Sequence, residues 1–432
     1  MNDKKKKIIA AISIPVFMVV VFFAGFFVGR IKDPDVAALE FIVKKYKAYY
    51  LETDDDFVGV MADSILDRYS QYYSPEEYAE LQKAAKGIRG GVGISFISDD
   101  KGVTVYDVLG NSPAERAEVK IGSLVTGLKK SENSDYINIS ELSQINDFLK
   151  DLTLGEKFNL KAIIGSETTE YELAREEYTE TYVYYTDNSG SYRFQSDESG
   201  KIKFVRYSDD TRGVSGNTAY CLYKSFNGNG DGLAASAAQI DEVLKKFKAD
   251  GKKKLILDLR NNGGGYMDIA EKVARHFVGI GKAKKPLIAK AVYKDGKEEK
   301  FYSASVDYPD YGFEAITILA NSGTASASEV LIGAMLDYDT DGIVKVVLEA
   351  YNEKGTPVYR TYGKGIMQTT FPNYSGGGAI KLTTAKLYWA KSGISIHGKG
   401  VTKNIEKYGN KVFEPEVVDG TDYAFEYAIA DF

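Results

Sequence analysis

Hydrophobic positions recur with two different periods along the chain, and these periods separate predicted helices from predicted strands. From Asp35 to about Lys86, apolar residues recur every three or four positions, which predicts a helical arm. Between about residues 87 and 178, short alternating runs surround two helical stretches, which predicts a compact domain of strands with two helices. After Ala219, buried strands alternate with amphipathic helices, which predicts an α/β core with its binding loops at the strand ends. The elements predicted in this core are the helix 234–247, the strand 254–259, the helix 266–278, the strand 315–320 and the helix 325–336.

Three other stretches have weaker patterns. Residues 178–210 are rich in Tyr, Ser, Gly and Asp, and we interpret them as surface hairpins without chemistry. Strands dominate between Lys345 and Ile405, and the acidic tail after Phe413 carries aromatic residues that can dock back on the body. A chain of 432 residues exceeds one typical core, so several domains are expected.

The N-terminus has the pattern of a membrane anchor. Lysines 4–7 precede residues 8–29, which carry no charge and are long enough to span roughly 30 Å of hydrocarbon. Four phenylalanines between residues 22 and 27 occupy the place where a cleaved signal has small residues, so an uncleaved anchor is favoured over a cleaved signal. Because the lysines stay inside, we expect a single-pass protein of the cell membrane with its C-terminal body extracytoplasmic.

Composition excludes several classes of function. The net charge is -6, and no basic stripe occurs outside the N-terminus, which argues against nucleic-acid binding. The single cysteine, Cys221, lies in an apolar run and is expected to be a buried core residue. His276 and His397 are far apart in the sequence and form no zinc motif, so we expect no metal and no cofactor, and chemistry without imidazole.

Ser326 lies in a segment that is typical of a strand end, a turn of small residues and a helix start, Ala320–Val330. A helix N-terminus offers free N–H groups and a positive dipole end to a developing oxyanion, so a serine there is well placed to attack a carbonyl. Ser326 and Glu329 also fit a capping box, in which the hydroxyl only closes the helix. This segment alone leaves both interpretations open.

Two further segments carry candidate chemistry. Leu255–Gly265 is a buried strand that ends in three glycines, which suits an oxyanion site, whereas a phosphate site is less favoured because the P-loop pattern is absent; a plain tight turn also fits. Lys364 is flanked by Gly363 and Gly365. In a tight, dry corner such a lysine has a lowered pKa and can accept the serine proton; taken alone, it also fits a surface loop.

Together these segments resemble one family, the C-terminal processing or tail-specific serine peptidases. The resemblance extends from about Leu66 to Ile405 and rests on several motifs in the family's order. These motifs are Leu66-Asp-Arg-Tyr-Ser70, Pro75-Glu-Glu-Tyr78, Gly91-Val-Gly-Ile94, Ser112-Pro-Ala114, Asp258-Leu-Arg-Asn-Asn-Gly-Gly-Gly265, Thr324-Ala-Ser-Ala-Ser-Glu329, Gly363-Lys-Gly365 with Gln368, and Leu382-Thr-Thr-Ala-Lys386.

The resemblance implies a catalytic role for each of five residues. Ser326 is the nucleophile, Lys364 is the general base, and Gln368 orients the lysine. The backbone N–H groups of Ala327 and of Gly264, or of a neighbouring glycine, form the oxyanion hole. The segment between nucleophile and lysine, residues 339–360, is longer than the corresponding segment usually is in this family.

The resemblance also implies a peptide-binding module and a domain plan. The carboxylate-binding loop of a PDZ-like domain consists of Gly91, Val92, Gly93 and Ile94. The implied fold class is a multidomain α/β (α+β) protein with a transmembrane helix, a helical arm, a PDZ-like domain and a ClpP/crotonase-like α/β peptidase core. The expected parts are the lysine cluster and signal anchor 1–30, the arm 31–86, the PDZ-like domain 87–178, the peptidase core 179–410 and the acidic tail 411–432.

The resulting hypothesis is a membrane-anchored, extracytoplasmic serine endopeptidase that cleaves proteins near their C-termini through a Ser/Lys dyad and an acyl-enzyme. Its expected partners are proteins or peptides with exposed C-terminal tails and the membrane, and Gly25 and Gly29 can pack two anchors into a homo-oligomer. The alternative is an inactive PDZ-bearing scaffold that binds tails without cutting them. A cell-surface structural protein explains the anchor but not the glycine turns.

Overall fold

The protein divides into two units, Met1–Ile65 and Leu66–Phe432, and each is described by itself. The first contains the helices α2 (Pro34–Tyr49) and α3 (Phe57–Ile65). The predicted anchor, residues 8–29, lies outside the described residues, and no helix within the described ranges is both long and apolar enough to cross a bilayer. The computed structural model describes residues 33–49, 57–99, 102–130, 134–196, 202–230, 232–278, 285–304, 310–353, 356–418 and 420–431.

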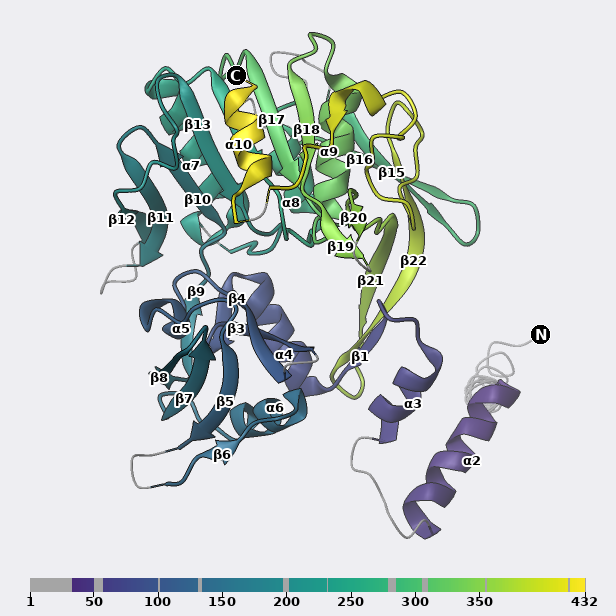
Figure 1. The fold of residues 1–432 in the computed structure, drawn as a ribbon. Coiled ribbons are helices and arrows are strands. Elements are labelled where there is room, and N and C mark those ends of the chain that lie inside the picture. The colour runs from purple at the N-terminus through teal and green to yellow at the C-terminus, as the bar shows by residue number, and fades with distance from the viewer. Residues whose placement is uncertain are drawn as a thin grey trace, which may run out of the picture. The chain divides into compact units, whose positions relative to one another are not determined.

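An eight-stranded sheet forms the centre of the second unit (Figure 1). In spatial order its strands are β12 (Ile202–Ser208), β11 (Gly190–Ser196), β10 (Val183–Asp187), β13 (Thr218–Tyr223), β14 (Lys254–Asp258), β17 (Ala315–Ala320), β18 (Val344–Leu348) and β23 (Val412–Phe413). The first three form an antiparallel meander, and the last five run parallel. Because parallel strands end at the same edge, the loops after β13, β14 and β17 lie close together.

Helices cover both faces of this sheet. The larger core, which includes the fully buried Cys221, packs α7 (Ser236–Ala249), α8 (Met267–Ala274) and α9 (Ala327–Tyr338) against one face. On the other face, α10 (Tyr423–Ala430) buries Phe425 in a smaller cluster. The aromatic C-terminal tail therefore docks on the body, as the sequence predicts.

Residues 178–210 form the predicted hairpins, β10–β11 and β11–β12, but the predicted surface position is wrong for much of the stretch. β10 and β11 pair within the central sheet, and Val183, Tyr185 and Phe194 are buried in its core. The polar composition misled the prediction because a tyrosine ring buries a large apolar area even though the residue counts as polar.

A second, five-stranded sheet brings distant segments together. β22 (Ala379–Trp389) pairs with β1 (Gln71–Tyr73), so the predicted helical arm is interrupted by a strand before α4 (Pro75–Ala85). A three-residue strand is too short for periodicity to reveal, and its partner lies some 300 residues away in the chain. The other strands of the sheet are β15 (Leu287–Tyr293), β16 (Glu298–Tyr302) and β21 (Ile366–Pro372).

The long connection before Lys364 consists of regular elements. It contains β18 of the central sheet and a hairpin of β19 (Tyr351–Glu353) and β20 (Thr356–Val358). The extra length is therefore taken up by these strands, and Lys364 still lines the same cavity as Ser326. Two short 3-10 helices, η1 (Gly232–Ala234) and η2 (Gly409–Lys411), complete the core.

The segment from Ile88 to Thr179 has its own sheet and its own core, in which Val105, Leu128 and Phe158 are buried. The predicted order of strands with two helices is present, and β3 (Ile94–Asp99) lies at an edge of the six-stranded sheet. Its elements are β2 (Ile88–Gly91) paired with β9 (Glu176–Thr179), the sheet β3 (Ile94–Asp99), β4 (Gly102–Val108), β5 (Leu124–Lys129), β7 (Lys157–Ile164) and β8 (Glu167–Ala174) with β6 (Ile137–Asn138), and the helices α5 (Pro113–Arg116) and α6 (Leu142–Lys150).

Candidate active site

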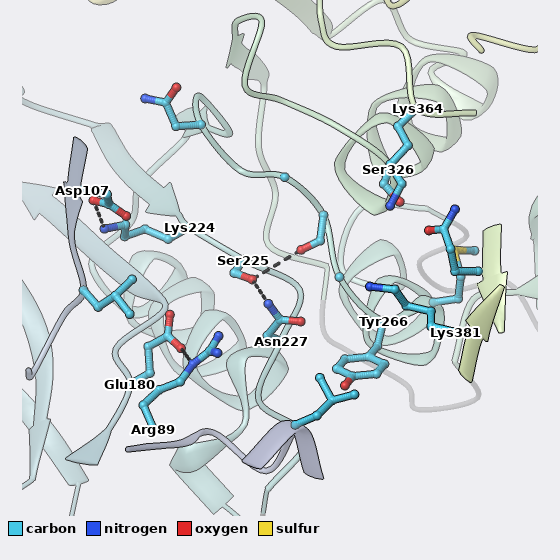
Figure 2. Close-up of a pocket in the computed structure, with 18 of the residues that line it drawn as sticks. Arg89, Asp107, Glu180, Lys224, Ser225, Asn227, Tyr266, Ser326, Lys364 and Lys381 are labelled. Atoms are coloured by element: carbon cyan, nitrogen blue, oxygen red, sulfur yellow. Dashed lines mark hydrogen bonds and ion pairs between the residues drawn. The ribbon is translucent and has the colours of Figure 1, made fainter. Parts of the chain in front are cut away.

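A cavity of about 870 Å³ lies at the carboxyl ends of the parallel strands. Ser326, Lys364, Gln368 and Gly264 all line it, so the structure brings four of the predicted catalytic residues into one space. Figure 2 shows the Lys364 side chain extending alongside Ser326. The nucleophile candidate comes from the loop after β17, and the lysine comes from the segment just before β21.

Ser326 has a strained backbone at the start of α9. Its φ of 58° and ψ of -117° are rare for a residue with a side chain, and such strain costs on the order of 1–3 kcal/mol. The next residue, Ala327, begins the helix, and its N–H donates to no acceptor in the described part of the chain. The hydroxyl therefore stands beside an open helix N-terminus, where the dipole favours negative charge.

Glu329 joins the serine segment to the lysine segment. Its carboxylate is fully buried, and one oxygen accepts the N–H groups of both Ser326 and Lys364, each at 2.9 Å. The other oxygen accepts the Gly363 N–H at 2.8 Å and the Thr361 hydroxyl at 2.5 Å. Burial raises the pKa of Glu329, while these four donors act in the opposite direction. The capping contact that the sequence indicated is thus also a cross-link between the two candidate catalytic residues.

The Lys364 amine lies in an environment that disfavours its charge. Burial lowers its pKa below the usual lysine value, and the positive charge of Lys381 acts in the same direction, whereas Glu329 opposes both. The amine also lies 5.4 Å from the centre of the Tyr69 ring. A larger fraction of this lysine is therefore neutral, and able to accept a proton, than of a lysine in water.

The glycine turn after β14 is fixed to both sides of the serine by Asn262. The carbonyl of this buried asparagine accepts the Ala325 N–H at 3.0 Å and the Ser328 hydroxyl at 2.9 Å. Its side chain donates to the Tyr223 carbonyl at 2.6 Å, which ties the turn to the end of β13. The turn and the serine segment therefore form one rigid surface.

Gly264 packs directly against the serine segment. A Cβ at this position would lie 2.7 Å from the Ala325 oxygen and 2.8 Å from the Ala327 nitrogen, so only glycine fits. Its own N–H donates to the Asn262 side chain at 3.0 Å, whereas the N–H groups of its neighbours 263 and 265 meet no acceptor among the described residues. The predicted oxyanion donor is therefore already engaged, and its two neighbours carry the available N–H groups of the turn.

A partly buried ion network supports this turn. Arg260 contacts Asp258 at 2.7 Å, Glu349 at 3.0 Å and Asp422 at 2.6 Å. Asp422 is the N-cap residue of α10, so the C-terminal helix is tied to the strand end that precedes the glycines. Breaking a network of this kind leaves an unpaired charge, which is destabilising.

Gln368 reaches the cavity from β21. Its amide nitrogen donates to the Thr383 hydroxyl at 3.2 Å, and that hydroxyl donates to Asp67 at 3.3 Å. Among the described residues it makes no direct hydrogen bond to Lys364. It therefore lies in the same cavity as the lysine but is held by a neighbouring strand.

The predicted carboxylate-binding loop lies outside the catalytic cavity. Within it, the carbonyls of Val92 and Gly93 accept the N–H groups of Ala114 and Leu109, each at 2.9 Å. The N–H groups of Val92 and Gly93 donate to no acceptor within the described ranges. The loop joins Gly91, the last residue of β2, to Ile94, the first residue of the edge strand β3.

Neither histidine lines the catalytic cavity. His276 is buried, its Nδ1 lies 2.8 Å from the Tyr311 hydroxyl, and burial lowers its pKa to about 3. His397 lines two other cavities. No cluster of potential metal ligands occurs in the part of the chain that the structure describes.

Sequence reasoning missed three residues of the site. Glu329 was interpreted only as a capping residue, although its spacing from Ser326 was the available signal. Lys381 lies directly before the Leu382-Thr-Thr motif, and Arg260 lies inside the Asp258–Gly265 motif. Lys381 is placed by the pairing of β22 with β21, and two partners of Arg260, Glu349 and Asp422, are distant in the sequence, so no local pattern identified these roles.

The chain is similar to known serine proteases. Residues 217–407 match the model of peptidase family S41. Proteins named "Probable CtpA-like serine protease" are similar to the chain: one from Staphylococcus aureus (strain MSSA476) is 28% identical over 395 residues, which cover 88% of this chain and 66% of the relative. One from Staphylococcus epidermidis (strain ATCC 12228 / FDA PCI 1200) is 28% identical over 368 residues, which cover 83% of this chain and 62% of the relative.

A solved structure shares the fold. The putative S41 protease from Bacteroides fragilis NCTC 9343 has a TM-score of 0.50 and 14% identity, and the match covers 89% of this chain and 91% of that chain. The matches support a serine-type peptidase with a mixed α/β fold, as the sequence predicts. The match to peptidase family S41 and the similarity to these relatives agree with the family resemblance that the sequence predicts. It spans less than two thirds of the length of the curated relatives named above, at 66% and 62%.

Proposed function

We propose that this protein is a serine endopeptidase in which Ser326 attacks the peptide bond and Lys364 is the general base. The observation that carries the proposal is the buried Glu329 carboxylate, one oxygen of which accepts the N–H groups of both residues. The shared cavity and the lowered pKa of Lys364 support the same assignment. An inactive scaffold is not favoured, because tail binding requires neither a strained serine nor a desolvated lysine.

The residues of the site suffice for acyl transfer. Neutral Lys364 accepts the Ser326 proton while the serine oxygen adds to the substrate carbonyl carbon. The resulting oxyanion is stabilised by the Ala327 N–H and by an N–H of the turn 263–265. When the C–N bond breaks, the Lys364 ammonium returns its proton to the leaving amine. Water, deprotonated by the same lysine, then hydrolyses the acyl-enzyme and regenerates the serine.

Substrate tails are recognised, in this proposal, by the PDZ-like domain around the loop from Gly91 to Ile94. Unused N–H groups in a glycine loop suit a terminal carboxylate, and the free edge of β3 suits an added peptide strand. Residues 8–29 anchor the protein in the cell membrane with its body outside the cytoplasm, and paired anchors would give a homo-oligomer. The substrates are proteins with exposed C-terminal tails.

The test uses the full-length chain in detergent with a quenched fluorescent peptide that has an apolar C-terminus. Ser326→Ala and Lys364→Ala should each abolish hydrolysis and retain cooperative thermal unfolding. Ser322→Ala is the control, because this serine lies four residues away, outside the catalytic cavity, and should keep normal turnover. Hydrolysis at the wild-type rate in both active-site variants would contradict the proposal.

The pH profile provides a second measurement. Lys364 acts as a base only when it has lost its proton, so kcat/KM should rise with pH through its pKa. Because that pKa is lowered, the rise should level off below the ordinary lysine value of 10.5. A rate that does not change between pH 6 and 9 would argue against lysine as the base.

A further inference from the structure

The catalytic cavity has a positive lining in a chain whose net charge is -6. Seven charged side chains line it, and cations outnumber acids by five to two. The cations are Arg89, Lys224, Arg260, Lys364 and Lys381, and the acids are Asp107 and Glu180. The excess of positive charge is therefore a local property of the cleft.

Both acids of the lining are already paired. Glu180 binds Arg89 at 2.7 Å, and Asp107 binds Lys224 at 3.0 Å. Arg260 is held by the buried Asp258 and by the half-buried Glu349 and Asp422. These three cations are therefore occupied by protein carboxylates.

Lys364 and Lys381 are the two remaining cations. Lys364 must be neutral to act as the base, so Lys381 is the charge that is left for a ligand. Within the described residues no carboxylate lies within ion-pair distance of Lys381, and its amine lies 5.5 Å from the centre of the Tyr73 ring. A partly buried ammonium without a counter-charge is unfavourable until an anion binds.

The backbone of Lys381 is fixed from two sides. It lies on β22, opposite Gln71 of β1 and Thr370 of β21. Figure 2 shows its side chain beside Tyr266, below Ser326 and Lys364, and all four residues line the same cavity. An anion bound by Lys381 would therefore lie within the cleft that holds the scissile bond.

We propose that Lys381 is a specificity-determining residue that binds a carboxylate of the peptide substrate inside the catalytic cleft. This inference rests on the proposed peptidase function and names a substrate class for it: peptides that carry an acidic side chain near the scissile bond or a free C-terminal carboxylate close to it. A charge-assisted hydrogen bond to such a group is stronger than a neutral one. The site is separate from the glycine loop of the PDZ-like domain.

The experiment compares matched peptides with the same enzyme at one pH. In one arm, Asp replaces Asn at successive positions around the cleaved bond in a peptide with an amidated C-terminus. In the other arm, a neutral peptide of the same sequence carries either a free or an amidated C-terminus. The readout is the ratio of kcat/KM between the charged and neutral members of each pair, which cancels any change in the Lys364 base.

Wild-type enzyme should prefer the charged member in at least one arm, and Lys381→Ala should lower that ratio about tenfold. Lys381→Arg should retain most of the preference, and Lys381→Glu should reverse it in favour of a peptide with Lys in place of Asp. Lys386→Ala is the matched control, because Lys386 lies on the same strand but faces another cavity. It should leave both ratios unchanged.

The arm in which the ratio falls identifies the source of the carboxylate. A ratio that is the same in wild type and Lys381→Ala in both arms overturns the inference. If Ser326→Ala still abolishes cleavage in that case, the proposed peptidase function stands and only the substrate class fails. If Ser326→Ala cleaves normally, the proposed function itself fails.

Discussion

Two glycine-rich segments of this protein have similar sequences but opposite environments. In the turn after β14, Gly264 packs against the serine segment, and Asn262 fixes the turn through three hydrogen bonds, to Ala325, to Ser328 of α9 and to Tyr223 of β13. In the loop before β3, a Cβ on Gly93 would lie 2.0 Å from the Ser112 Cβ, whereas a Cβ on Gly91 would meet nothing within 4 Å. The N–H groups of Val92 and Gly93 meet no acceptor within the described ranges. The first segment is packed against the serine segment at Gly264, and the second is packed at Gly93 but open at Gly91.

The difference indicates what each segment does. Acyl transfer requires donors and nucleophile to be held within fractions of an ångström, so the turn at the catalytic cavity is cross-linked and tightly packed. Capture of a peptide tail requires unused N–H groups that the tail can reach, so the other loop leaves them unpaired. Glycine serves close packing at Gly264 and access at Gly91.

The largest expected effect comes from adding a methyl group to the closed turn. Gly264→Ala places a Cβ within 2.8 Å of the backbone around Ser326, so the turn must shift and the oxyanion donors with it. We expect kcat to fall by about 100-fold or more. Gly263→Ala, whose Cβ would meet nothing within 4 Å, should lose far less. Steady-state kinetics of both variants decide the comparison; equal losses would show that packing against the serine segment is not the cause.

An intermediate effect is expected when the cross-link between serine and lysine is weakened. Glu329→Gln replaces a buried carboxylate that accepts four hydrogen bonds. The amide NH₂ of glutamine would then face two of these hydrogen-bond donors instead of accepting from them. We expect about 3 kcal/mol less unfolding free energy in urea and about a tenfold loss of kcat/KM. Glu353→Gln, an exposed carboxylate on β19, should stay within about 0.5 kcal/mol of wild type. Stability equal to wild type in Glu329→Gln would contradict the cross-link.

The smallest effect should follow the same methyl addition in the open loop. Gly91→Ala has space for its Cβ, and only its φ of 152° adds strain, so we expect a stability loss of about 1 kcal/mol or less. Cleavage of a short peptide should change by about threefold at most, because the loop lies outside the catalytic cavity. Thermal unfolding and kcat/KM measure both quantities. A loss as large as that of Gly264→Ala would remove the distinction between the two segments.

Much of the site was predictable because its residues lie in short motifs. Ser326, Lys364, Gln368 and Gly264 were predicted from local residue types and a family resemblance, and all four line one cavity. Residues whose role depends on a distant partner were missed: Lys381 becomes part of the site through β22, and Arg260 is held by Asp422 from the C-terminal helix.

By itself the sequence determined the alternation of strands and helices in the core, the small-residue turn that begins α9 and the family that the chain resembles. These features depend on hydrophobic period, turn chemistry and contiguous motifs, all of which act over a few residues. The tertiary structure decided that Glu329 joins the serine to the lysine and that the Gly264 N–H is already engaged. It also decided that the tyrosine-rich strands β10 and β11 belong to the central core. Burial and hydrogen bonding between segments far apart in the chain set these outcomes, and no local pattern specifies them.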